Sequence, residues 1–132
     1  MTRSPERILA EARTIAVVGA SPRPERPSHG VMRYLLAQRY RVIPVRPDVE
    51  EVLGVACAAT LADVGEPIDM VDVFRRVEFC PDVTRDAVAA GAGAVWLQLG
   101  LISPDSRAIA EAASVDYVEN ECTAIVHRRL KP

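Results

Sequence analysis

The chain has 132 residues, of which 49% are hydrophobic, and its 16 basic and 18 acidic side chains leave a formal net charge of -2. This length fits one domain with a core of ordinary size. The near-neutral charge argues against a binding surface for nucleic acid or for an anionic membrane. No apolar run reaches the roughly 20 residues of a membrane span, and the N-terminus lacks the apolar core of a signal peptide. We therefore expect a cytoplasmic protein with a single domain over 1–132, in which an N-terminal helix over 1–13 precedes a core over 14–130.

Apolar runs and capping patterns alternate along the sequence. Ser4-Pro5-Glu6 has the pattern of an N-cap followed by proline, which predicts a helix to Ala12. Ser28 and Asn120 are the expected N-caps of two further helices. The expected strands are 14–18, 41–45, 68–74, 94–98 and 116–118, and the expected helices between and after them are 28–39, 81–90, 104–113 and a short one that follows Asn120.

Strands that alternate with helices at this spacing predict an α/β fold, a doubly wound parallel sheet of about five strands with helices on both faces. In such sheets ligands bind outside the carboxyl ends of the strands. The residues at these strand exits are Gly19, Ala20, Ser21, Val45, Arg46, Pro47, Phe74, Arg75, Arg76, Gln98, Leu99, Gly100 and Cys122. Several of them are arginines although the chain as a whole is slightly acidic, which indicates a phosphorylated ligand.

The turn after the first strand has the features of a phosphate-binding turn. Gly19 and Ala20 let the backbone come close to a ligand, and the next helix presents unpaired N–H groups and the positive end of its dipole. The hydroxyl donors and positive charges of this turn are Ser21, Ser28, Arg23 and Arg26. A turn that binds no ligand is the alternative interpretation.

The identity of the phosphorylated ligand follows in part from what the turn lacks. A dinucleotide-binding turn has G-x-G-x-x-G and an acidic residue at the end of the second strand. Here Gly30 is the next glycine after Gly19, and the second strand ends in Arg46. This pattern disfavours NAD and favours a ligand with a phosphate on its ribose, either NADP or coenzyme A (CoA). Arg46 as a solvated surface arginine is the alternative.

Five motifs in order, at 15–21, 26–32, 42–47, 72–76 and 96–100, resemble those of small stand-alone CoA-binding proteins. These proteins are similar to the N-terminal CoA-binding domain of the succinyl-CoA synthetase alpha subunit. The resemblance implies a Rossmann-like fold with CoA lying across the strand exits. It implies phosphate contacts at Gly19, Ala20, Ser21, Arg26 and Ser28, adenosine contacts at Val45, Arg46 and Pro47, and contacts with the rest of CoA at Phe74, Arg75, Gln98, Leu99 and Gly100. Pro27, Arg76 and Cys122 complete the expected CoA-binding residues.

Two departures from the family pattern concern the ends of this site. Arg46 stands between two prolines where the family usually has asparagine. Glu119 and Glu121 occur where the family often has a basic residue before the cysteine, and we expect their charge to weaken an anion site there. Cys122 is expected to be a buried, inert thiol, with a mixed disulfide to CoA as the alternative hypothesis.

The sequence shows no catalytic constellation, and its cysteines lack metal-ligand spacing. We therefore predict a protein that is not an enzyme and binds CoA or acyl-CoA without catalysis. Two alternatives stay open: an NADP- or other nucleotide-dependent enzyme subunit that acts with a partner, and an interaction module that has lost ligand binding. A homo-oligomer or an unidentified protein partner also stays open.

Overall fold

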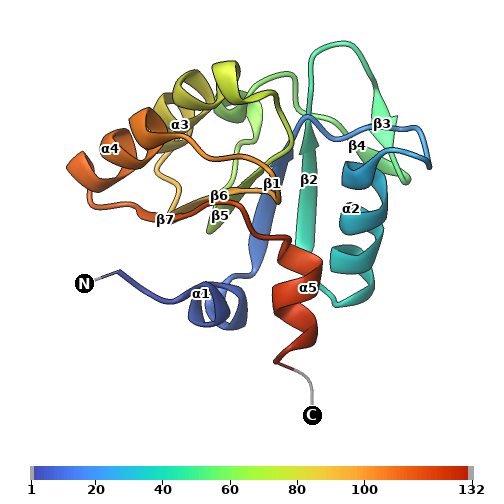
Figure 1. The fold of residues 1–132 in the computed structure, drawn as a ribbon. Helices are drawn as coiled ribbons and strands as arrows, with labels where there is room; N and C mark the ends of the chain where they lie inside the picture. The colour runs from blue at the N-terminus through green and yellow to red at the C-terminus, as the bar shows by residue number, and fades with distance from the viewer. Residues whose placement is uncertain (1, 131–132) are drawn as a thin grey trace.

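The computed structural model of the protein describes residues 2–130 and has a five-stranded parallel sheet at its centre (Figure 1). The strands are Thr14–Val18 (β1), Arg41–Val45 (β2), Met70–Val73 (β5), Ala94–Leu97 (β6) and Asp116–Val118 (β7). They lie in the order β2-β1-β5-β6-β7, so the strand order reverses between β1 and β5. The ends of the expected 1–132 domain, residues 1, 131 and 132, lie outside the described residues.

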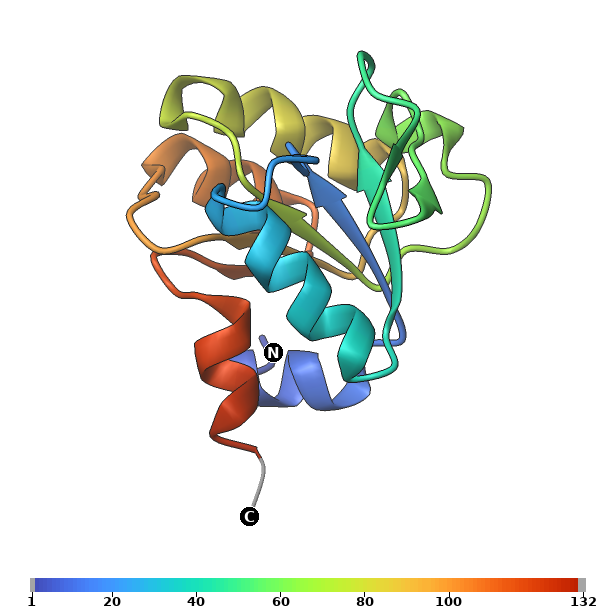
Figure 2. The ribbon, with the colours of Figure 1, turned by 90° about the vertical axis from the view of Figure 1, so that its right-hand side faces the viewer.

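Helices cover both faces of the sheet, which confirms the predicted fold class. The helices are Pro5–Glu11 (α1), Pro27–Ala37 (α2), Cys80–Ala89 (α3), Pro104–Ala112 (α4) and Thr123–Arg128 (α5). Figures 1 and 2 show α1, α2 and α5 on one face and α3 and α4 on the other. Within residues 2–130, no helix has both the length and the apolar content that a membrane crossing needs.

The core consists of two apolar layers, one on each face of the sheet. Along β1, Ile15 and Val17 pack toward α1, α2 and α5, whereas Ala16 and Val18 pack toward α3. All four side chains are almost completely buried. Because both faces are covered, the strands read as continuous apolar runs, and this is why their positions are visible in the sequence.

Proline is tolerated in β2 because β2 is the edge strand. Pro44 pairs in register with Val17 and lies within the ladder that β2 forms with β1. The Pro44 carbonyl points outward and accepts a hydrogen bond from the N–H of Ala58 at 2.9 Å. The missing N–H of proline therefore costs no hydrogen bond to β1.

Short elements lie between β2 and β5 and between β5 and α3. The hairpin of Glu51–Val52 (β3) and Val55–Ala56 (β4) turns at Leu53 and Gly54, whose φ angles are 51° and 77°. Glycine suits this turn because a two-residue hairpin turn with two positive φ angles favours it. Two turns of 3-10 helix follow at Leu61–Asp63 (η1) and Val77–Phe79 (η2).

Two expected helix caps are wrong. α2 begins at Pro27 after the N-cap Arg26, and α5 begins at Thr123 after the N-cap Cys122. Ser28 instead accepts a hydrogen bond from the N–H of Ser21 at 3.0 Å, and Asn120 accepts one from the N–H of Gly100 at 2.8 Å. Both side chains satisfy backbone groups of the strand-exit loops rather than of the helix that follows them.

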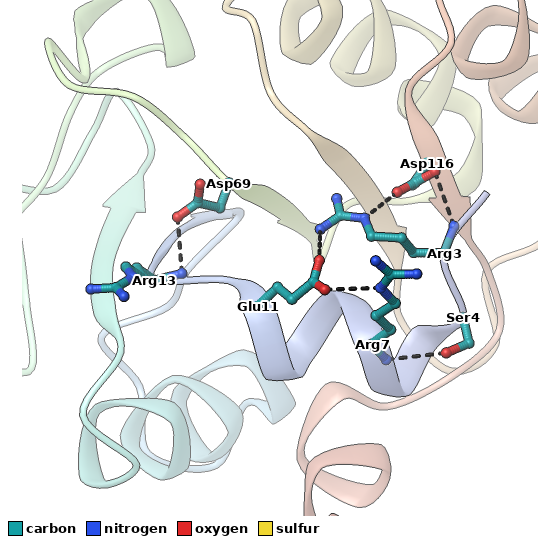
Figure 3. A network of polar contacts seen from close by, with 7 residues as sticks. All are labelled: Arg3, Ser4, Arg7, Glu11, Arg13, Asp69 and Asp116. Carbon is teal, nitrogen blue, oxygen red and sulfur yellow. Dashed lines mark hydrogen bonds and ion pairs between the residues drawn. The ribbon is translucent and has the colours of Figure 1, made fainter. Parts of the chain in front are cut away.

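A polar network fixes α1 at the amino ends of the strands, opposite the strand exits (Figure 3). Arg3 donates from Nε to Asp116 of β7 at 2.6 Å and from Nη1 to Glu11 at 3.0 Å. Asp69 accepts hydrogen bonds from the backbone N–H groups of Arg13 and Thr14. The N-cap at Ser4 is as predicted, since its Oγ accepts from the N–H of Arg7 at 3.1 Å.

Candidate functional site

Two adjoining clefts lie at the carboxyl ends of the strands. The larger cleft, of about 1190 Å³, is lined by residues that follow β1, β2, β5 and β6 and by the start of α5. The smaller cleft, of about 610 Å³, lies on the β2 side. The two share Gly19, Arg46, Asp48, Phe74 and Arg75. Together they form one continuous surface across the point where the strand order reverses, where ligands of such sheets bind.

The structure brings nearly all of the predicted site residues to these clefts. The larger cleft is lined by Gly19, Ser21, Arg26, Pro27, Ser28, Arg46, Phe74, Arg75, Arg76, Gln98, Leu99 and Cys122, and the smaller cleft adds Val45 and Pro47. Ala20 and Gly100 line neither. Ala20 is fully buried, and its carbonyl accepts a hydrogen bond from Arg46 at 3.0 Å. That the other residues contact a ligand stays a prediction.

Gly19 sets the close approach of β1 to the residue after β5. Its φ is +85°, and a Cβ at this position would overlap the carbonyl oxygen of Phe74. The N–H of Gly19 donates to the Val45 carbonyl at 3.1 Å, and the N–H of Phe74 donates to the Val18 carbonyl at 2.9 Å. Three strand exits therefore meet at a residue that has no side chain.

The β1–α2 turn is held by its own hydroxyl groups. The N–H of Ser21 donates to Ser28 Oγ at 3.0 Å, and the N–H of Arg23 donates to Ser21 Oγ at 3.1 Å. A hydroxyl that accepts still has its own hydrogen to donate. Both serines line the larger cleft, so they combine a structural contact with a free donor beside the first turn of α2.

Positive charge gathers around the larger cleft. Arg23, Arg26, Arg75 and Arg76 line it, and none of the four forms an ion pair with another residue of the described chain. The guanidinium groups of Arg75 and Arg76 lie 4.5 and 5.6 Å from the ring centroid of Phe79. Such stacking limits their conformations and leaves their N–H groups to bind an anion.

Arg46 differs from these four arginines because it already has partners. Its Nε and Nη2 donate to the two carboxylate oxygens of Asp48 at 2.7 and 2.9 Å, and its Nη1 donates to the Ala20 carbonyl. Arg46 is therefore held by neighbouring groups, and its contact with a ligand stays a prediction. Arg46 ties the end of β2 to the end of β1, and Asp48 neutralises much of its charge.

A buried polar network lies beneath the larger cleft. Asp72 of β5 is fully buried and accepts hydrogen bonds from the amide of Gln98 and from the hydroxyl of Thr123, the latter at 3.1 Å. The Gln98 amide also donates to Thr123 Oγ1 at 3.0 Å. Burial raises the pKa of Asp72 to about 7, although these two hydrogen bonds act in the opposite direction. The network joins β5, β6 and the start of α5.

The acidic residues near Cys122 have partners outside the clefts, and the weakening of an anion site by their charge stays a prediction. Glu119 accepts from the N–H of Ser103 at 3.1 Å and from the hydroxyl of Tyr117 at 2.9 Å. Glu121 lies 3.9 Å from Arg129. Neither carboxylate lines either cleft. Their carboxylates bond instead to residues at the start of α4 and in β7 and to Arg129, which follows α5.

Cys122 is not the buried thiol that we expected. It is partly exposed, lines the larger cleft and is the N-cap of α5. The indole N–H of the buried Trp96 donates to the Glu121 carbonyl at 2.7 Å and so holds the backbone just before it. The mixed disulfide between Cys122 and CoA stays a hypothesis.

Several cleft residues were not identified from the sequence. They are Pro22, Val31, Asp48, Val49, Phe79, Leu101 and Ile125. Most are apolar residues on helices or loops, whose spacing in the sequence looks the same whether they face a core or a cleft. The acidic Asp48, two residues after Arg46, was the one visible signal of a local ion pair. Within residues 2–130, no cluster of three or more metal-ligand side chains occurs.

The strand order and the cleft define the class: a Rossmann-like α/β domain whose basic cleft lies at the strand exits. The chain belongs to the CoA binding domain family, whose sequence model matches residues 13–128. This match confirms the resemblance to CoA-binding proteins that the five sequence motifs indicated.

Relatives of similar length and a much longer enzyme are both similar to this chain. YneT of Bacillus subtilis (strain 168), an uncharacterized protein, is 35% identical over 120 residues, which are 91% of this chain and 89% of YneT. A hypothetical protein from Pyrococcus horikoshii OT3 has a TM-score of 0.92 at 37% identity, with 97% of this chain and 92% of that chain covered. The ADP-forming acetate–CoA ligase of Methanocaldococcus jannaschii is 20% identical over 92% of this chain but over 18% of its own length.

Proposed function

We propose that this chain binds CoA or acyl-CoA, without catalysis, in the clefts at the strand exits. The observation that carries the proposal is a group of four arginines around one cleft, in a chain of the CoA binding domain family. These arginines, which form no ion pair within residues 2–130, are Arg23, Arg26, Arg75 and Arg76. CoA carries a pyrophosphate and a ribose phosphate, and planar guanidinium groups suit both.

The proposed placement follows the shape of the site. The pyrophosphate lies at the start of α2, where Arg26 and the hydroxyl groups of Ser21 and Ser28 converge at the positive end of the helix dipole. The adenine lies in the smaller cleft, beside Val45 and Pro47. The pantetheine arm then runs in the other direction, past Gln98 toward Cys122.

Thermal unfolding with a series of ligands tests this function. We expect CoA, at about a hundred times its dissociation constant, to stabilise the reduced protein by roughly 2.7 kcal/mol, which raises the midpoint by several degrees. The rise should shrink with dephospho-CoA, which lacks the ribose phosphate, and should be absent with NAD. A larger rise with NADP would favour a nucleotide-dependent enzyme subunit, and no rise with any ligand would favour a module without a ligand.

Substitution of single arginines compares how much an arginine without an ion pair and the paired Arg46 contribute to CoA affinity. Arg26→Ala should weaken CoA binding about tenfold or more, since a charge-assisted hydrogen bond contributes roughly 1.5 to 3 kcal/mol. Arg46→Ala should weaken it less, because Asp48 already neutralises Arg46. Calorimetric titration measures both dissociation constants.

The matched control for these titrations is Arg85→Ala. Arg85 is exposed on α3, pairs with Asp82 at 2.8 Å and lines neither cleft. Equal CoA affinity in Arg26→Ala and Arg85→Ala would show that the phosphate assignment is wrong.

A further inference from the structure

The larger cleft has a basic half, in which arginines stand among apolar residues such as Phe74 and Phe79, and an apolar half without charged side chains among the described lining residues. The two halves lie over different strands. Its arginines follow β1, β2 and β5, either at the strand exits or in the β1–α2 turn. On the opposite side, Leu99 and Leu101 follow β6, and Ile125 lies on α5. Since β6 is next to β5 in the sheet, a ligand that crosses the exits passes from charged to apolar surroundings.

We infer that the apolar half holds an aliphatic acyl chain, so that acyl-CoA is preferred over free CoA. This inference rests on the proposed binding of CoA. The acyl group and the ribose phosphate are at opposite ends of an acyl-CoA molecule, and the acyl group is attached to the thiol. A molecule whose phosphates occupy the basic half therefore carries its acyl chain to the side of Leu99 and Ile125.

Exposure of the apolar half supports an apolar occupant. Leu99 is 66% exposed and Ile125 is 44% exposed, although both line a cleft in which a ligand could cover them. Apolar side chains that line a concave surface are a usual feature of ligand sites, and their burial by a ligand is favourable.

The charges near this half are engaged elsewhere. Glu119 bonds to Ser103 and Tyr117, and Glu121 lies beside Arg129. The acidic residue that lines the larger cleft, Asp48, is at the end of β2 and is paired with Arg46. An acyl chain can therefore lie beside Leu99 and Ile125 without burying an unpaired carboxylate of the described cleft wall.

The polar residues between the two halves suit the middle of the ligand. Gln98 lines the cleft there and is held by hydrogen bonds to Asp72 and Thr123. Cys122 follows on the same side of the cleft, before Ile125. The amide-rich pantetheine arm has polar groups for this stretch, and the acyl chain begins beyond it. The order of surfaces along the cleft thus matches the order of groups along acyl-CoA.

Calorimetric titration with CoA and with acetyl-, butyryl-, hexanoyl- and octanoyl-CoA, each below the concentration at which it forms micelles, tests this inference. For the wild type we expect affinity to rise roughly twofold to fourfold for each methylene that leaves water. The measured quantity is the ratio of the dissociation constants of CoA and octanoyl-CoA in the same variant. Because each variant supplies its own CoA reference, a general loss of affinity does not change the ratio.

In the double variant Leu99→Ser with Ile125→Ser, we expect this ratio to fall below about threefold, since serine removes most of the apolar contact. The control is Ile102→Ser. Ile102 is 54% exposed and follows β6 in the same loop as Leu99, but it lines neither cleft, so its ratio should equal that of the wild type.

Different results would overturn the acyl preference and the proposed CoA binding. A wild-type ratio near one, with CoA itself bound, overturns the acyl preference and leaves CoA binding intact. An equal loss of the ratio in Ile102→Ser also overturns it, because the effect would not come from the cleft. Absence of binding by CoA and by every acyl-CoA overturns the proposed function as well.

Discussion

Gly19→Ala is expected to lower the free energy of unfolding by roughly 2 kcal/mol or more and to weaken CoA binding at least tenfold. A side chain at a φ of +85° is strained, and its Cβ would overlap the Phe74 carbonyl oxygen. Because that oxygen belongs to backbone, the exits of β1 and β5 would have to move apart. The phosphate-binding turn and Phe74 would then lose their relative positions. Urea denaturation and calorimetry measure the two effects.

Substitutions at two other glycines distinguish the effect of the Cβ overlap with Phe74 from that of the strain at a positive φ angle. Gly54 and Gly100 have φ angles of +77° and +93°, and nothing lies within 4 Å of a Cβ built at either position. Gly54→Ala and Gly100→Ala should therefore show only the conformational cost, roughly 1 kcal/mol. If Gly19→Ala is as stable as Gly54→Ala, the close approach of the two strand exits does not require glycine.

Asp72 should make the protein less stable as the pH rises from about 4 to about 7. Burial raises the pKa of Asp72 to about 7, above the usual 3.8 of aspartate. Between these values the folded state holds a proton that the unfolded state has lost, so the free energy of unfolding falls with increasing pH. A difference of about three pKa units corresponds to roughly 4 kcal/mol, lost progressively across this range.

The variant Asp72→Asn isolates this contribution, because asparagine keeps the shape of the side chain and does not titrate. We expect the stability of Asp72→Asn minus that of the wild type to increase by roughly 4 kcal/mol from pH 4 to pH 8. Contributions of other groups cancel in the difference. Urea denaturation at each pH gives both values. A difference that stays constant over this range would show that the Asp72 pKa is not raised in the folded protein.

The sheet could be predicted from the sequence because its signals are local and repeated. A strand buried on both faces is a continuous apolar run, as at 14–18, and the helices between such runs begin with recognisable caps at Ser4 and Ser103. Ser28 and Asn120 look like caps by the same rule. Their side chains bond instead to the N–H groups of Ser21 and Gly100, and the partner of Asn120 is twenty residues away in the chain.

The candidate site was partly predictable because the rule for strand exits needs only the strand positions. Leu99 and Arg75 come two residues after the ends of β6 and β5 and were found in this way. Ile125 and Phe79 were missed because a helix and a 3-10 turn bring them to the cleft. The partners of Glu119, Ser103 and Tyr117, could not be predicted because they depend on how α4 packs on β7.

A crystal structure of the protein with CoA would test most directly the claim that the strand exits form the binding site. The expected result has the pyrophosphate at the start of α2, within hydrogen-bond distance of Arg26, and the adenine beside Val45 and Pro47 in the smaller cleft. CoA bound elsewhere would contradict the claim, for example in the cleft beside Tyr40 and His127 near the amino ends of the strands. Clefts at the strand exits that stay empty at saturating CoA would contradict it as well.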